Sequence, residues 1–330
     1  MRVVSGIQPT GNLHLGNYLG AIRRWVKLQD EVECLIFLAD LHAITVYNDP
    51  AELRANVNGM AAALIACGID PDKAVLFNHA RVPAHPEMAW LLSCTARIGW
   101  LNRMTQFKEK SGKNREGVSV GLYAYPVLQA ADVLLYQATH VPVGEDQKQH
   151  VELMRDIAIK FNTDYAVELF TLPEPHIGDT AARIMSLRDG NAKMSKSDPS
   201  DMSRINLSDE SDAIAQKIRK AKTDPEPLPD NPDDLAGRPE ALNLVTIYAA
   251  LTDSTPRAVL AEHAGQGFGQ FKPRLADLLV ETIAPIRARL KDFEADPASL
   301  EAILAKGSAK ASELAAPTLE GAYRALGLPR

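Results

Sequence analysis

Short apolar runs alternate with longer stretches of helical periodicity in the first half of the chain. The runs predict strands at residues 2–6, 34–40 and 74–78, and the stretches predict helices at 16–29 and 51–66. Strands and helices in alternation form a parallel sheet with helices on both faces. Ligands of such a doubly wound sheet bind beyond the carboxyl ends of its strands. Residues 6–17 and 40–45 follow strands in this way, so we expect a ligand site there.

The pattern changes after about residue 200, where the strand signals disappear. Amphipathic periodicity predicts helices at residues 208–221, 239–251, 256–264, 272–290 and 298–326. We expect interruptions of the last helix near Gly307 and Pro317, and no regular structure in the proline-rich loop at 223–239, because proline lacks the amide hydrogen. The sequence therefore predicts an α/β fold, with a doubly wound parallel sheet in residues 1–206 and an all-helical C-terminal domain in 207–330. The last helix can pack back on the first domain.

Length and composition fit a packed protein without a membrane segment. The chain has 330 residues, 46% apolar and 24% charged, which suits two domains or one large α/β unit with a helical appendage. No apolar run approaches the roughly 20 residues that span a bilayer, and residues 1–4 lead into a strand rather than a signal peptide, so we expect a cytoplasmic protein. Cys34, Cys67 and Cys94 lack Cys-x-x-Cys spacing, so we expect buried free thiols rather than a metal site.

Charge is distributed unevenly along the chain. The net charge of −6 argues against a protein that coats nucleic acid, because affinity for a polyanion comes mainly from phosphate neutralisation. Basic residues nevertheless cluster in two segments. Residues 97–115 contain six basic residues and one acidic residue, and residues 217–222 contain four basic residues. An acidic body with basic patches suits oriented binding of a structured RNA. The alternative is that these patches are solvated helix faces without a partner.

Two segments carry residues suited to a polyphosphate. Residues 9–17 follow the first strand and open a helix, with glycines at 11 and 16 that let a ligand approach the backbone. Residues 193–197 place two lysines around small or flexible residues, and Asp198 and Pro199 end the segment. Each segment alone is commonly an ordinary turn or a solvated loop. Together, about 180 residues apart, they predict one nucleotide site closed by two pieces of chain.

Polar side chains form a stripe on a predicted helix at 122–136. Tyr125, Gln129, Asp132 and Tyr136 are spaced by four, three and four residues, so they share one face. Their neighbours are apolar, and a carboxylate inside such a helix is costly unless something donates to it. The donor for Asp132 is either a protein group or a ligand. Residues 144–147 follow another short strand at 141–143, and their acidic side chains either complement a helix dipole or bind a ligand's hydroxyl groups.

These segments resemble the signatures of a known family. Residues 14–17 look like the "HIGH" signature of class I aminoacyl-tRNA synthetases, and residues 193–197 match their "KMSKS" signature letter for letter. Residues 5–11, 104–110 and 143–150 are similar to bacterial tryptophanyl-tRNA synthetases specifically. The resemblance implies a Rossmann-like catalytic domain and a helical domain that binds the tRNA anticodon. It also implies that L-tryptophan and ATP give tryptophanyl-adenylate and pyrophosphate, that tryptophan passes to the 3′ end of tRNA(Trp), and that the protein is a homodimer.

The resemblance also implies roles for individual residues. Those that match ATP contacts are Gln8, Pro9, Thr10, Gly16, Asn17, Gly144, Glu145, Asp146, Ile184, Lys193, Met194, Ser195, Lys196 and Ser197. Those that match groups stabilising the reacting phosphates are His14, Asn17, Lys110, Lys193 and Lys196, with Mg²⁺ carried by the ATP phosphates. Those that match the tryptophan pocket are Asp132, Tyr125, Gln129, Gln147, His42 and Val4.

In this pocket Asp132 matches the acceptor of the indole N–H, and Tyr125 and Gln147 match the pair that holds the α-amino group. Gln129 departs from the methionine that many relatives carry. Three alternatives stay open: a tyrosine-specific relative, a small-molecule nucleotidyltransferase, and a non-catalytic paralogue that binds tRNA.

Overall fold

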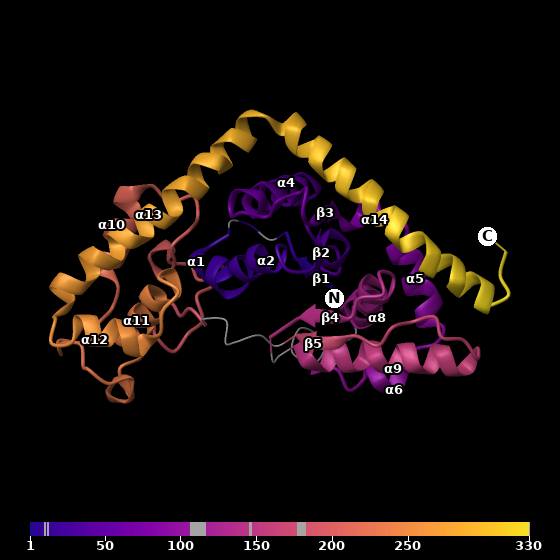
Figure 1. Ribbon diagram of the computed structural model, residues 1–330, viewed down its shortest axis with the longest axis horizontal. Helices are drawn as coiled ribbons and strands as arrows, with labels where there is room; N and C mark the ends of the chain where they lie inside the picture. The colour runs from indigo at the N-terminus through magenta and orange to yellow at the C-terminus, as the bar shows by residue number, and fades with distance from the viewer. Residues whose placement is uncertain (10, 12, 106–116, 145–146, 177–182, 330) are drawn as a thin grey trace.

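The fold is built on a sheet of five parallel strands, with helices on both sides (Figure 1). The computed structural model describes residues 1–9, 11, 13–105, 117–144, 147–176 and 183–329. The strands are β1 (Arg2–Ile7), β2 (Glu33–Leu38), β3 (Val75–Asn78), β4 (His140–Pro142) and β5 (Glu174–His176), in the order β3-β2-β1-β4-β5. The order reverses at β1, because the chain moves outward to β3 and then returns to the other side of β1 with β4. The prediction of a doubly wound parallel sheet is confirmed.

Alternating side chains of the strands face two separate hydrophobic clusters. Val3, Ile36 and Leu38 belong to a cluster with the helices that follow β1 and β2. Val4 and Phe37 point to the other face and pack with the helices that follow β3 and β4. A sheet that is buried on both faces needs apolar residues at almost every strand position, which explains the unbroken apolar runs.

Helices in the first half occupy the segments between the strands. They are α1 (Leu15–Asn17), the π-helical turn η1 (Tyr18–Ile22), α2 (Arg23–Leu28), α3 (Asp40–Ala43), α4 (Pro50–Ala66), the 3₁₀ turn η2 (His79–Arg81), α5 (Ala84–Ser93), α6 (Ile98–Leu101), α8 (Val120–Leu134) and α9 (Lys148–Asp164). α1, η1 and α2 follow one another without a break, so the predicted helix at 16–29 is present with a π-helical turn inside it. Cys34 and Cys67 are buried free thiols, but the prediction was wrong for Cys94, which is exposed because it follows the last residue of α5 at the surface.

Helices dominate the second half, as the periodicity predicted. They are the 3₁₀ turn η5 (Asp201–Ser203), α10 (Ser211–Lys220), the 3₁₀ turn η6 (Pro232–Leu235), α11 (Pro239–Leu251), α12 (Pro256–His263), α13 (Phe268–Ala295) and α14 (Pro297–Ala325). The expectation of no regular structure in the proline-rich loop was wrong at η6, where the Asn231 side chain caps one turn by accepting from the backbone N–H of Asp233. No helix in the described part of the chain is long and apolar enough to cross a membrane.

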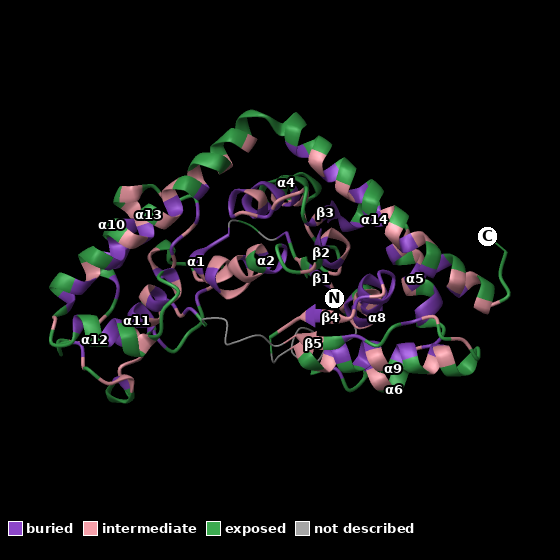
Figure 2. Cartoon of the chain, viewed as in Figure 1, coloured by how far each residue is buried: buried purple, intermediate pink, exposed green. Residues whose placement is uncertain are grey.

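The two longest helices, α13 and α14, form an inverted V over the sheet (Figure 1). Their outward sides carry most of the exposed residues, and their inward sides carry the buried ones (Figure 2). The ion pair of Arg81 with Glu301 and that of Lys306 with Asp72 join α14 to the segments around β3, at 2.7 and 2.8 Å.

Helix α14 continues through Gly307 and Pro317, so the expected interruption does not occur. The reason at Gly307 is packing. A Cβ atom at this position would lie only 1.8 Å from the backbone oxygen of Leu76 in β3. Glycine is therefore needed for the close approach of helix and strand rather than for a break in the helix.

Replacement of Gly307 should be costly for this reason. We predict that Gly307→Ala lowers the free energy of unfolding by about 2 kcal/mol or more, because helix α14 must move away from β3 to accommodate the methyl group. Gly59→Ala is the matched control, since Gly59 lies in α4 with nothing within 4 Å of the added carbon, and it should be neutral or stabilising by about 0.5–1 kcal/mol. Urea unfolding monitored by circular dichroism measures both, and equal stability of the two variants would contradict the packing argument.

Candidate functional site

The turn after β1 ends in the first helix. Gly11 has a φ of +63°, in the left-handed region that favours glycine. His14 lies at the N-terminus of α1, and its backbone N–H donates to Oδ1 of Asn17 at 3.1 Å. Because β1 and β4 are parallel neighbours at the point where the strand order reverses, this turn lies where α/β folds bind ligands.

The two phosphate-suited segments lie side by side. The backbone N–H of Leu15 donates to the oxygen of Ile205 at 2.8 Å, and that of Leu207 donates to the oxygen of Leu13 at 3.0 Å. These antiparallel bonds hold residues 13–15 against residues 205–207, which follow the lysine segment. The predicted proximity of the two segments is thus present in the structure.

The space that two glycines leave open shows how closely the segments approach each other. A Cβ atom at Gly16 would lie 3.0 Å from Nδ1 of His14 and 3.5 Å from Cβ of Met194. A Cβ atom at Gly11 would lie 3.9 Å from Cδ of Lys196. Because glycine has no side chain, both positions leave open the space between the first turn and the lysine segment.

The lysine segment, residues 193–197, is anchored by its centre. Met194 is buried, and its backbone N–H donates to the oxygen of the buried Ile184 at 3.0 Å. Lys193 and Lys196 are exposed on either side of this anchor. The hydroxyl groups of Ser195 and Ser197 are 2.9 Å apart in a compact turn. The arrangement carries two lysines on a fixed stretch of backbone.

His14 is neutral at physiological pH. Burial, followed by the positive charges of Arg204, Lys196 and Lys193, lowers the pKa of its imidazole to about 4. Burial also lowers the pKa of Lys196. The Nδ1 atom of His14 is buried and has no hydrogen-bond partner among the described residues. A neutral imidazole with an unmatched nitrogen can donate to an anionic oxygen without adding a further full charge.

The polar stripe on α8 lies mostly in the protein interior. Tyr125, Asp132 and Tyr136 are buried, and Gln129 is half-buried. The Tyr125 hydroxyl lies 3.0 Å from Nε2 of His150 in α9. Val4, predicted to line the same pocket, is fully buried within β1, on the face of the sheet that packs against α8.

Asp132 is completely buried and has three histidine partners. Nε2 of His42 lies 2.7 Å from Oδ2, Nε2 of His79 lies 2.7 Å from Oδ1, and Nδ1 of His85 lies 2.8 Å from Oδ1. Burial alone would raise the pKa of the Asp132 carboxyl, but His79 and His42 outweigh it and hold that pKa well below its usual range. The carboxylate is therefore ionised in the interior.

Sequence reasoning proposed His42 for this pocket and missed His79 and His85. The available signal was their position directly after the third strand, at the same edge of the sheet as residues 40–45. Four predicted residues, Thr10, Lys110, Glu145 and Asp146, lie outside the described residues. Gln147 and Gly144 flank the last two, and the backbone N–H of Gln147 donates to the oxygen of Gly144 at 3.0 Å, just before α9.

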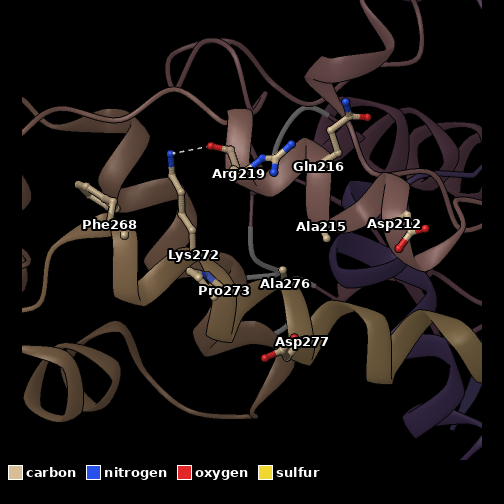
Figure 3. A pocket seen from close by; sticks show the side chains of 10 residues that line it. Asp212, Ala215, Gln216, Arg219, Phe268, Lys272, Pro273, Ala276 and Asp277 are labelled. Carbon is tan, nitrogen blue, oxygen red and sulfur yellow. Dashed lines mark hydrogen bonds between the residues drawn. The ribbon is translucent and has the colours of Figure 1, made fainter.

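The basic patch predicted at residues 217–222 has fewer exposed charges than expected. Lys217 is buried and pairs with Asp201 and Asp209, and Lys222 pairs with Glu240. Arg219 remains exposed at the end of α10 and lines a hollow between α10 and α13. Figure 3 shows Arg219 and Gln216 along one side of this hollow, and Phe268, Lys272 and Pro273 along the other.

The chain matches known proteins over its full length. Residues 1–283 match the family model of the class I tRNA synthetases (W and Y). A tryptophan-tRNA ligase of Caulobacter vibrioides is 61% identical over 327 residues, which cover 99% of this chain and 95% of the relative. The chain belongs to this family of class I tRNA synthetases. The resemblance deduced from the two signatures is confirmed.

Further relatives of the synthetase agree in sequence and in fold. A tryptophan-tRNA ligase of Rhizobium meliloti is 54% identical over 344 residues, which cover 98% of this chain and 97% of the relative. The crystal structure of a tryptophanyl-tRNA synthetase from Campylobacter jejuni, complexed with ADP and tryptophan, has a TM-score of 0.84 and 35% identity and covers 99% of this chain and 100% of its own. The identities favour the tryptophan branch of the synthetase family over the tyrosine branch.

The neutral state of His14 has a measurable consequence for the stability of this synthetase. In the unfolded chain the imidazole pKa is about 6.5, above the value of about 4 in the folded protein. Between these values the unfolded chain binds a proton that the folded protein does not, so the free energy of unfolding should fall as the pH falls from 6.5 towards 4. We predict that the free energy of unfolding falls less steeply with falling pH in His14→Gln than in the parent. The two slopes should differ by up to about 1.4 kcal/mol per pH unit. Urea unfolding across this pH range tests it, and identical slopes would refute the neutral state.

Proposed function

We propose that this chain activates L-tryptophan with ATP to form tryptophanyl-adenylate and pyrophosphate, and then transfers tryptophan to the 3′ end of tRNA(Trp). The observation that carries the proposal is the contact between the turn at residues 11–16 and the lysine segment, in a chain whose relatives are tryptophan-tRNA ligases. A tyrosine-specific activity has less support, because both of these relatives are tryptophan-tRNA ligases. The tRNA substrate would place the enzyme in the cytoplasm.

The first step is attack of the tryptophan carboxylate on the α-phosphorus of ATP, with pyrophosphate as the leaving group. Such a reaction requires positioning of the reactants and neutralisation of the charge that grows on the phosphates. Gly11 and Gly16 leave room for the phosphates near the backbone, and the unmatched Nδ1 of His14 offers them a neutral donor. Lys193 and Lys196 supply positive charge from the opposite side. These residues fit a triphosphate.

Mg²⁺ fits the same site as a partner of ATP rather than of the protein. Residues 13–17 and 193–197 provide imidazole, amide and ammonium groups and contain no carboxylate. Mg²⁺ prefers phosphate oxygens and keeps several of its waters. We therefore propose that the ion enters on the phosphates and that these protein segments bind the remaining phosphate charge. The roles of Gly144 and Asp146, which match the ribose contacts, stay predictions.

We propose that residues 1–206 form the catalytic domain and that residues 207–330 bind the anticodon region of the tRNA. The hollow between α10 and α13 supports the second part, since the exposed Arg219 lines it together with Lys272 and the largely buried ring of Phe268 (Figure 3). Two carboxylates, those of Asp212 and Asp277, also line it. Unpaired RNA bases bind by stacking on such aromatic or apolar groups while basic side chains contact the phosphates. Arg219 is the basic residue that lines this hollow from α10.

Two substitutions should separate activation from tRNA binding. We predict that Lys196→Ala slows tryptophan-dependent ATP–pyrophosphate exchange by about 100–1,000-fold, the typical effect of removing one charge-stabilising donor. Arg219→Ala should leave this exchange unchanged, weaken tRNA binding, and reduce the slope of log Kd against log salt concentration by about one. Each variant is the control for the other. Parental exchange in Lys196→Ala would contradict the nucleotide site, and parental tRNA binding in Arg219→Ala would contradict the tRNA surface.

We also propose a homodimer formed through an exposed apolar surface near the start of α8. Tyr47, Trp90, Ile98 and Val120 are 71–90% exposed. The hydrogen bond from Ser119 Oγ to the Thr45 oxygen, at 2.7 Å, holds the loop that carries Tyr47 against the start of α8. Large apolar side chains that are left exposed are typical of interaction sites.

Introduction of charge on this surface should separate the subunits. We predict that Trp90→Glu combined with Val120→Glu gives a monomer in sedimentation velocity, because two carboxylates would be buried without partners at the interface. Leu242→Glu, on the exposed side of α11, is the control and should keep the mass of the parent. A parent that sediments as a monomer, or a double variant that stays dimeric, would contradict the proposed surface.

A further inference from the structure

The three histidines around Asp132 differ in how the protein holds them. The side chains of His79 and His85 are 0% exposed, whereas that of His42 is 9% exposed. His79 belongs to η2 and His85 to α5, which both follow β3, whereas His42 belongs to the four-residue helix α3. The rings of His42 and Tyr125 are nearly perpendicular, at 6.2 Å between centroids. Of the three histidines, only His42 has an exposed part of its side chain.

The two oxygens of Asp132 are used unequally. Oδ1 accepts from both His79 and His85, which fills its two acceptor positions. Oδ2 accepts only from His42 within the described part of the chain. Asp132 itself has no exposed surface, and its one partner with any exposed surface, His42, is on Oδ2, so a ligand that approaches from the side of His42 meets this oxygen.

Protons on the two inner histidines are fixed by their surroundings. Nδ1 of His85 donates to Asp132, because an ionised carboxylate can only accept, and Nε2 lies 2.7 Å from the Tyr136 hydroxyl, which can serve it in either role. Nδ1 of His79 is buried without a partner among the described residues, so a proton there would be an unsatisfied donor. His79 is therefore neutral and donates from Nε2. Two fixed N–H groups thus hold the Asp132 carboxylate ionised and in one orientation.

We infer that His79 and His85 are positioning residues for Asp132, and that His42 occupies the acceptor position on Oδ2 that the indole N–H of tryptophan takes when the amino acid binds. The inference rests on the proposed function. Indole has one N–H donor and no acceptor. Its complement is therefore an ionised carboxylate on which one hydrogen bond, that of His42 to Oδ2, can be replaced. The imidazole N–H of His42 fills that position while the site is empty of amino acid, which avoids an unpaired buried charge.

Discrimination against an analogue without the N–H donor tests the positioning role. Tryptophan and benzothienylalanine, in which sulfur replaces the ring N–H, are compared as substrates in ATP–pyrophosphate exchange. His79→Leu should raise the KM for tryptophan by about tenfold and leave the KM for the analogue and both kcat values unchanged, because only the N–H contact depends on the orientation of Asp132. His79→Gln, which keeps an N–H donor, should restore discrimination. His263→Leu removes a buried imidazole of α12 and should keep parental discrimination.

The two roles predict opposite effects. His42→Ala removes the competing donor, so its KM for tryptophan should be unchanged or lower, in contrast to His79→Leu. Parental discrimination in His79→Leu would overturn the positioning role, and a rise in the KM of His42→Ala equal to that of His79→Leu would overturn the exchange. A parent that fails to exchange pyrophosphate with tryptophan would instead overturn the proposed function itself.

A measurement on the unaltered protein is independent of how the variants fold. With histidine labelled by ¹⁵N, tryptophan should shift the ring resonances of His42 and leave the N–H groups of His79 and His85 in place. Unchanged His42 resonances would overturn the exchange. The ligand atoms of His42, His79 and Asp132 lie within 4.8 Å of one another, so a metal ion is the competing explanation. Stoichiometric zinc in the purified protein would overturn the inference, because the nitrogens would then be ligands rather than donors.

Discussion

The antiparallel pairing of residues 13–15 with residues 205–207 is the contact on which the proposed nucleotide site depends. It joins two parts of the chain that are almost 200 residues apart in sequence. Backbone hydrogen bonds fix this register, and Gly16 lets His14 and Met194 pack across it. Positive charge from the lysine segment reaches the turn after β1 because of this pairing. Burial, and then the charges of Arg204 and of this segment, lower the pKa of His14 and keep it neutral. The same backbone pairing therefore determines both the shape of the proposed site and the charges around it.

The proposed amino-acid site is built on α8. This helix packs in the same hydrophobic cluster as Val4 of β1, and its side chains Asp132 and Tyr125 are buried. A charged side chain in this interior is stable only because three imidazoles donate to it. In the proposed exchange the same constraint gives selectivity, since a ligand that replaces His42 must supply an N–H of its own.

Much of this organisation could be predicted from the sequence. Unbroken apolar runs predicted the parallel strands, helical spacing predicted the α8 stripe, and the residue types of the glycine and lysine segments predicted that these two segments lie close together. Features set by tertiary contacts could not be predicted. His79 and His85 contact Asp132 from 53 and 47 residues away, and no local pattern records that contact. Gly307 looked like a helix break and instead allows α14 to approach β3. Lys217 looked like part of a basic surface and is buried in an ion-pair network.

A crystal structure with a non-hydrolysable ATP analogue and Mg²⁺ tests the central claim most directly. The account predicts that the triphosphate lies between the turn at residues 11–17 and the lysine segment, with His14 Nδ1 and the ammonium groups of Lys193 and Lys196 within about 3.2 Å of phosphate oxygens. Phosphates bound away from either segment, with the lysines pointing to solvent in every subunit, would contradict it.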